Sequence, residues 1–218
     1  MASVVDICNL ALGNLGDAAT VASIDPPDGS VQAERCARFY PIARDSLLEL
    51  PSWGFATRRA QLALLGSGWP EWDYAYAQPA ETINVIAVLP PDASDDYSIG
   101  LTAGGVPGSA GGVYVPQPFS CEIDTSGANV IMTDQVDAVL RYTVRVSDPT
   151  KFSPLFTLCL SWHLASMLAG PILKGDAGAA ESKRCAAMMR SFLGEAILSD
   201  ASQRRISPSH NVSWISGR

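Results

Sequence analysis

Two residues on one predicted helix, Cys159 and His163, are the first candidates for chemistry in this chain. Their spacing of four residues places both side chains on one helix face, where they could act as nucleophile and base or begin a metal site. A catalytic pair also needs a third group that orients the base, and a metal needs further ligands. Ser161 falls on another side of the helix, and neither the second histidine, His210, nor a carboxylate cluster is paired with His163 to supply those ligands. We therefore expect His163 to be a satisfied core histidine, with a small cytosolic thiol hydrolase using Cys159 and His163 as the alternative.

Other patterns typical of catalysis are incomplete. The five cysteines include no CxxC pair, and four of them lie in apolar helical contexts, where free cysteine behaves as a small hydrophobic residue. The glycine-rich segment 104–112 could cradle a phosphate only with a strand before it, a helix after it and a nearby lysine. The lysine is missing, and a strand is predicted to follow. The sequence thus predicts no enzymatic activity, no cofactor and no metal site.

A first aromatic group follows the second predicted helix. Pro51 ends that helix because proline has no amide to donate and clashes with the preceding turn. Trp53 and Phe55 then flank Gly54, so two large rings stand beside a residue with few steric limits. This arrangement is typical of a core corner, where a helix gives way to another element.

A second aromatic group lies in the run 69–76, which holds four aromatic residues, among them Trp72, Tyr74 and Tyr76. Such a run could stack on bases or sugars. Because no lysine or arginine is interleaved with the rings, a core or subunit contact is favoured.

Two helices are predicted in the first quarter of the chain. Ser3 can cap the first, over 3–15, with Asp6 as a capping-box partner three residues later. The second covers 30–50, and Pro41 inside it should kink it or remove one backbone hydrogen bond.

The middle of the chain is predicted to form β-strands. The segment 81–89 is apolar on both faces, which predicts a central strand. The segments 119–123 and 136–146 alternate, which predicts half-buried antiparallel strands. The polar face of the longer one carries Asp137, Arg141, Thr143 and Arg145. Short strands are expected at 113–115 and 130–132.

Two further helices and a tail complete the chain. Ser153 caps an apolar helix with Pro154 at its first position, and Gly170-Pro171 should end it near Leu168. Asp176 should cap a last helix that runs to about Leu198. Its inward residues are predicted to be Met188, Met189, Phe192 and Ile197.

The predicted fold class is therefore α+β: a four-helix bundle with an inserted antiparallel β subdomain and an extended C-terminal tail. The expected boundaries place the bundle at 1–65 and 150–198, the insertion at 66–149 and the tail at 199–218.

Charge and composition restrict the partners. The chain has 218 residues and a formal charge of -7, which argues against a broad nucleic-acid-binding face. Residues 81–150 contain nine acidic and two basic side chains, whereas 151–218 contain four and eight. We expect no signal peptide and no apolar run of membrane-spanning length, and the unpaired cysteines fit a reducing compartment.

Several stretches, taken in order, resemble a known family. The strongest runs from Glu34 through Tyr40–Asp45 to Pro51–Ala56 and Arg58-Arg59. The others are Asp6–Gly16, Trp72–Tyr76, and Arg141–Asp148 continuing through Pro149 into Phe152–Phe156. Together they are similar to the tail tubular protein A family, the head-to-tail adaptors of tailed phages, over roughly residues 3 to 198.

The resemblance implies a virion protein of the phage neck, made in the host cytoplasm and without enzymatic activity. It implies a ring of copies, twelvefold, beneath a portal protein, with tail or nozzle proteins bound below and DNA passing through the middle without specific binding. A stopper or tail-completion protein one ring lower in the neck is the alternative within the same class. The acidic insertion is expected to face the lumen or the next tail component.

The tail after residue 198 is polar and basic, and it lacks the apolar periodicity needed to fold alone. Adaptors of the resembled family hold their portal partly through C-terminal extensions, which implies that this tail docks on the portal. Its apolar anchors would be Trp214 and Ile215. Its basic residues are Arg204, Arg205 and Arg218, and the first two would pair with portal carboxylates. The alternative is a frayed terminus.

Overall fold

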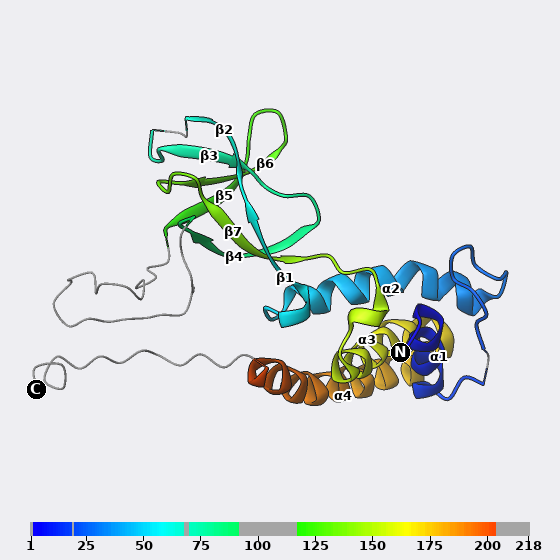
Figure 1. Ribbon diagram of the computed structural model, residues 1–218. Coiled ribbons are helices and arrows are strands. Elements are labelled where there is room, and N and C mark those ends of the chain that lie inside the picture. Colours follow the sequence, from blue (N-terminus) through cyan, green and yellow to red (C-terminus); the bar gives the residue numbers. More distant parts are fainter. Residues whose placement is uncertain (1, 19, 68–69, 92–116, 204–218) are drawn as a thin grey trace, which may run out of the picture. The chain divides into compact units, whose positions relative to one another are not determined.

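The structure is a computed structural model that describes residues 2–18, 20–67, 70–91 and 117–203 (Figure 1). It divides into two compact units, which we call the helical unit (1–56 and 145–203) and the β unit (57–144). The boundaries thus fall at 56/57 and 144/145 rather than at the predicted 65/66 and 149/150. Residues 57–61 form a strand, and the chain rejoins the helical unit as soon as the last strand ends.

The helical unit contains four α-helices and two short 3₁₀ turns. The helices are α1 (Val4–Asn14), α2 (Val31–Glu49), α3 (Pro154–Leu173) and α4 (Gly175–Ser202), and the turns are η1 (Gly54–Ala56) and η2 (Pro149–Lys151). The predicted capping box is confirmed: Ser3 Oγ accepts from the Asp6 amide at 3.1 Å, and Asp6 Oδ2 accepts from the Ser3 amide at 2.8 Å. Ser30 and Ser153 cap α2 and α3 with the serine side chain alone, which accepts from the amides of Ala33 and Phe156.

Helix α3 is the centre of this unit, because it contacts α1, α2 and α4. It continues through Gly170 and Pro171, so the predicted break near Leu168 is wrong. The chain turns instead at Lys174, whose φ is 56°, and at Gly175. The close approach of the two helices constrains Gly178 rather than Gly170: a Cβ on Gly178 would lie 3.3 Å from the Gly170 Cα, whereas a Cβ on Gly170 would meet nothing within 4 Å.

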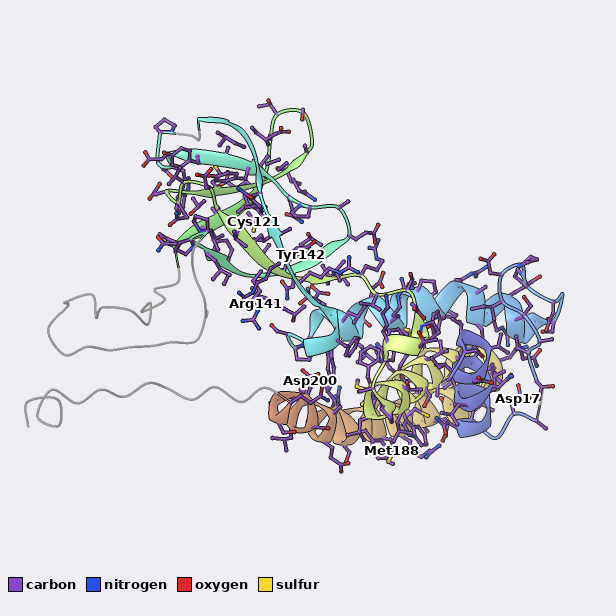
Figure 2. The ribbon with its side chains drawn as sticks, in the orientation of Figure 1. Asp17, Cys121, Arg141, Tyr142, Met188 and Asp200 are labelled. Carbon is purple, nitrogen blue, oxygen red and sulfur yellow. The ribbon has the colours of Figure 1, made fainter. Side chains whose placement is uncertain are left out.

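Helix α4 differs from its prediction at both ends. Lys174 occupies the N-cap position, and Asp176 lies in the first turn rather than at the cap. The helix continues to Ser202, so residues 199–202 belong to it and not to the tail. Ile197, expected to point inward, is 38% exposed. Met188, labelled in Figure 2, is half-buried, as are Met189 and Phe192.

The 20 residues of α3 are long and apolar enough to cross a membrane by length and composition. This corrects the expectation that no apolar run reaches that length. The core helix of a soluble protein passes the same test, and one face of α3 is buried against the other helices.

The β unit contains two antiparallel sheets within its described residues. The three-stranded sheet has the order β1 (Thr57–Gln61), β7 (Val139–Val144), β4 (Thr82–Leu89). The four-stranded sheet has the order β2 (Ala63–Ser67), β3 (Tyr74–Ala77), β6 (Asn129–Thr133), β5 (Phe119–Ile123). The α+β fold class is confirmed.

The prediction that 81–89 forms a central strand is wrong. β4 is at one edge of the three-stranded sheet and β7 is central. The alternation over 136–146 predicts a half-buried strand with a polar face, but on that face Arg141 is only 7% exposed and Thr143 only 1%. Antiparallel pairing puts Arg59 opposite Arg141 and Thr57 opposite Thr143. Polar side chains therefore gather on one face of this sheet, and that face is covered on β7 (Arg141 and Tyr142 are labelled in Figure 2).

Candidate functional site

Four rings of the helical unit pack into a cluster that we call the aromatic corner: Trp53, Phe55, Phe152 and Phe156. Phe156 is at its centre, with its ring centroid 5.1 Å from Trp53, 5.0 Å from Phe55 and 4.8 Å from Phe152. The Trp53 indole N–H donates to the Leu47 carbonyl at 2.8 Å, which satisfies its one polar group. Trp53 and Phe55, predicted as a core corner, thus pack against Phe156 on α3 and Phe152 just before it, and these two partners were not identified from sequence.

The end of α4 is attached to this corner through Asp200. The Gly54 amide donates to Asp200 Oδ2 at 2.8 Å, so a carboxylate from α4 satisfies a free amide at the start of η1 (Asp200 is labelled in Figure 2). A Cβ at Gly54 would lie 3.4 Å from Asp200 Oδ1, which is ordinary van der Waals contact, so the hydrogen bond itself rather than the glycine accounts for this approach. The two residues are 146 positions apart, and no local pattern pointed to their contact.

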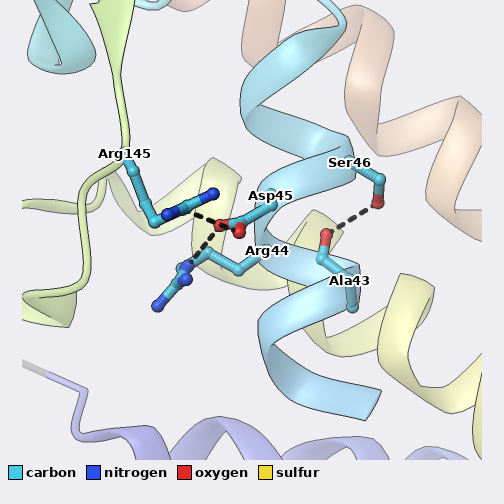
Figure 3. A network of polar contacts seen from close by, with 5 residues as sticks. All are labelled: Ala43, Arg44, Asp45, Ser46 and Arg145. Atoms are coloured by element: carbon cyan, nitrogen blue, oxygen red, sulfur yellow. Dashed lines mark hydrogen bonds and ion pairs between the residues drawn. The ribbon is translucent and has the colours of Figure 1, made fainter. Parts of the chain in front are cut away.

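A second polar contact joins α2 to the chain that returns from the β unit (Figure 3). Asp45 on α2 accepts from Arg44 Nε through Oδ1 at 2.8 Å and from Arg145 Nε through Oδ2 at 3.0 Å. Arg145 follows directly on β7, so this ion pair fixes the residue where the chain re-enters the helical unit. We call Arg44, Asp45 and Arg145 the Asp45 network.

Cys159 and His163 share α3 but do not form a nucleophile–base pair. The Cys159 thiol is fully buried, and burial raises its pKa to about 11, which opposes the thiolate that nucleophilic catalysis needs. His163 Nε2 instead lies 2.9 Å from Ser46 Oγ on α2. Burial lowers the pKa of His163. Within the described residues no group of three metal-ligating side chains occurs.

The second aromatic group lies in the β unit. Tyr76 is buried, and its hydroxyl donates to the Gln135 carbonyl at 2.9 Å. The rings of Tyr74 and Tyr76 are 6.2 Å apart. Trp72 is half-buried and lines a small hollow with Pro70, Glu71 and Glu122, which the sequence did not indicate. This group thus has a packed end at Tyr76 and an accessible end at Trp72.

The proposed portal-docking residues lie outside the described part of the chain: Arg204, Arg205, Trp214, Ile215 and Arg218. The glycine-rich segment 104–112 and the strand expected at 113–115 also lie outside it. No protein-family model matches this chain, and no curated protein matches it.

Proposed function

We propose that this chain is a structural virion protein, a head-to-tail adaptor that joins a portal protein to a tail or nozzle protein. Copies of the chain form a ring, twelvefold in the resembled family, and DNA passes through it without specific binding. The proposal rests on the resemblance to the tail tubular protein A family.

One structural observation supports this proposal above the others: residues from separate stretches of the resemblance meet in the helical unit. Asp45 and Trp53 come from the strongest stretch, whereas Arg145 and Phe156 come from the last one, about a hundred residues later. They form the Asp45 network and the aromatic corner. The resembling residues therefore hold the helices and the re-entering chain together, which is the role expected of a rigid assembly component.

The charge distribution supports a channel that does not retain DNA. Residues 57–144 contain ten acidic and three basic side chains. One of those three, Arg141, is buried. A surface of this kind repels phosphates and gives little counterion release on DNA binding. Filter binding at low salt tests this point, because tight and salt-sensitive binding by the isolated protein would contradict it.

Electron microscopy with purified cognate portal protein tests the function itself. We expect portal rings that carry an additional ring of this protein. Bare portals at saturating protein would count against an adaptor, and a reconstruction of the particle neck that places the chain one ring lower would favour the stopper or tail-completion protein.

The thiol hydrolase alternative makes an opposite prediction. A nucleophile must be reachable by its substrate, and Cys159 is fully buried with a raised pKa. If Cys159→Ala or His163→Ala abolished a measured turnover while the fold remained intact, the structural assignment would fail.

A further inference from the structure

The four-stranded sheet of the β unit ends in two outer strands, β2 and β5, whose outer edges are open among the described residues (Figure 1). β2 pairs only with β3, and β5 pairs only with β6. Within the described part of the chain, no further backbone hydrogen bond involves residues 63–67 or 119–123. Each outer strand therefore presents a row of amide and carbonyl groups that can pair with one more strand.

Exposed apolar side chains accompany both open edges. Leu64 on β2 is 58% exposed, and Ile123 on β5 is 69% exposed. Ala63 and Cys121, on the same two strands, are exposed as well. Edge strands are usually protected by lysine, proline or other charged side chains, and β2 contains none of these. Its protection is limited to a bulge between Leu64 and Gly66, which leaves Ala63 and Leu64 in regular register.

The directions of the two outer strands suit head-to-tail pairing between copies of the chain. All neighbouring strands of this sheet are antiparallel and there are four of them, so β2 and β5 run in opposite directions. β5 of one copy can therefore add to β2 of the next as an antiparallel strand while both sheets keep the same orientation. Contacts of this kind cover both open edges of a copy, whereas a twofold β2–β2 or β5–β5 contact would cover only one.

Charge complementarity also favours a contact between β2 and β5. In an antiparallel pair, the end of β5 lies beside the start of β2 and the preceding strand β1, from which β2 is separated by Leu62 alone. β1 carries Arg58 and Arg59, which are exposed and are two of the three basic residues of 57–144. The exposed Glu122 lies near the end of β5, and Asp124 follows the strand. Opposite charges thus meet in a β2–β5 contact, whereas either twofold contact would bring together charges of one sign.

We propose that β2 of one copy pairs with β5 of a second copy and extends the four-stranded sheet from copy to copy. A heterologous contact of this kind forms a ring when the rotation between copies closes. The strand contact does not depend on the virion assignment, and only its closure into a ring rests on the proposed function. Each strand contributes five residues, whereas a standard interface has about 20–30 residues a side. The contact should therefore be weak in the free protein, where covalent capture can detect it.

Disulfide capture in the full chain tests the proposal, because Cys121 already lies on β5 and the other four cysteines are buried. Facing residues of an antiparallel pair have Cα atoms about 4.5–5.5 Å apart, which a disulfide can bridge. The variants Ala63→Cys, Leu64→Cys and Leu65→Cys are oxidised with oxidised glutathione, which forms one disulfide between copies and releases two molecules of reduced glutathione. At least one variant should give a ladder of covalent oligomers, because each copy carries both halves of the contact.

Two features of the ladder identify strand pairing. Ala63→Cys and Leu64→Cys should differ in rate, because neighbouring residues of a strand point to opposite faces. The faster variant should react about tenfold or more faster than the control Ile42→Cys, a position on α2 that is 55% exposed. High salt should slow the capture, because the charges near the contact are exposed. All these positions are exposed, so their replacement should leave the circular dichroism spectrum unchanged.

Four outcomes would overturn the proposal. Equal rates at all positions, Ile42→Cys included, would mean random collision. Dimers that persist in Leu64→Cys/Cys121→Ser would show a twofold β2–β2 contact, and wild-type dimers formed as rapidly through Cys121 would show a β5–β5 contact. If no variant gave a ladder while portal rings still carried the protein, the adaptor function would stand and this contact would be wrong.

Discussion

At the scale of single residues, Ser46 on α2 lies within hydrogen-bond distance of both His163 and a backbone carbonyl. The Ser46 hydroxyl oxygen is 3.0 Å from the Ala43 carbonyl oxygen and 2.9 Å from His163 Nε2, and the direction of the second bond depends on the histidine tautomer (the Ser46–Ala43 bond is drawn in Figure 3). His163 Nδ1 is buried without a partner among the described residues. A charged imidazole carries a hydrogen on both nitrogens, so its Nδ1–H would have no acceptor among those residues, which agrees with the lowered pKa of His163.

This arrangement predicts a pH dependence of stability. Burial lowers the pKa of His163 from its ordinary value of 6.5 in the folded protein only. The unfolded chain therefore binds this proton more readily, so the stability is present above about pH 6.5 and is lost as the pH falls below it. Urea unfolding at pH 7.5 and 5.5 should show a larger loss for the wild type than for His163→Gln. Parallel losses in the two proteins would show that His163 does not contribute.

The five cysteines allow a second prediction at this scale. Cys121 on β5 is exposed, whereas the other four are buried in helices. Desolvation raises the pKa of Cys121, which slows its reaction relative to a free thiol, but its exposure should still let it react first. In native protein at pH 8, a thiol reagent should therefore modify one cysteine in an early phase and the others only as the protein unfolds, because reactivity requires an accessible thiolate. Cys121→Ser should remove the early phase, and denatured protein should give all five thiols. Rapid modification of Cys159 would contradict the buried position that opposes a hydrolase.

At the scale of elements, the contact between α3 and α4 depends on glycine. A Cβ at Gly178 would lie 3.0 Å from the Ala169 carbonyl oxygen, and this neighbour is helix backbone that cannot easily move. By contrast, a Cβ at Gly194, on the same helix, would meet nothing within 4 Å. Alanine is more favourable than glycine inside a helix by about 1 kcal/mol. Alanine at position 194 therefore tests helix propensity alone, whereas alanine at position 178 tests propensity together with the packing of α4 against α3.

We therefore expect opposite effects from the same substitution. Gly194→Ala should raise the free energy of unfolding by roughly 0.5–1 kcal/mol. Gly178→Ala gains the same propensity but must separate two packed helices, and overpacking costs typically about 1–3 kcal/mol, so it should destabilise. Thermal and urea unfolding of both variants measures the difference. If Gly178→Ala were stabilising as well, the close approach of the helices would be wrong.

Elements that a few neighbouring residues specify could be predicted from the sequence. Elements whose position depends on pairing with residues far away in the sequence could not. The Ser3–Asp6 capping box and the serine caps of α2 and α3 are encoded within a few residues, and the structure contains them. The place of β4 at a sheet edge depends on pairing with β7 some fifty residues away, which an apolar run does not reveal. Gly170-Pro171 has a local signal for a helix end, but α3, which packs against three other helices, continues through it to Leu173. Only Trp53 and Phe55 of the aromatic corner were predicted. These two residues are close together in the sequence, whereas Phe156 comes about a hundred residues later.

At the scale of the whole molecule, charge is distributed unevenly along the chain. Residues 57–144 are strongly acidic, whereas residues 204–218 contain three arginines and no acidic side chain. An acidic body with a short basic end can repel DNA and still bind an acidic partner surface. The end of α4 determines where such a partner-binding segment begins, since Asp200 is part of the helix and is bound to Gly54.

The tail prediction is therefore made with two truncations. Deletion of 204–218 leaves the Asp200–Gly54 hydrogen bond in place, so thermal unfolding of the free protein should be nearly unchanged while portal binding falls tenfold or more. Deletion of 200–218 also removes the carboxylate that binds the Gly54 amide, and loss of a charge-assisted hydrogen bond should destabilise by about 1–3 kcal/mol.

Trp214→Ala alone should reproduce most of the loss of binding, because a single buried indole anchor can contribute 2 kcal/mol or more. Sedimentation with purified portal and calorimetry of the free protein measure the two effects separately. If the chain that lacks 204–218 bound portal as tightly as the full chain, the segment would be a frayed end and the docking assignment would be wrong.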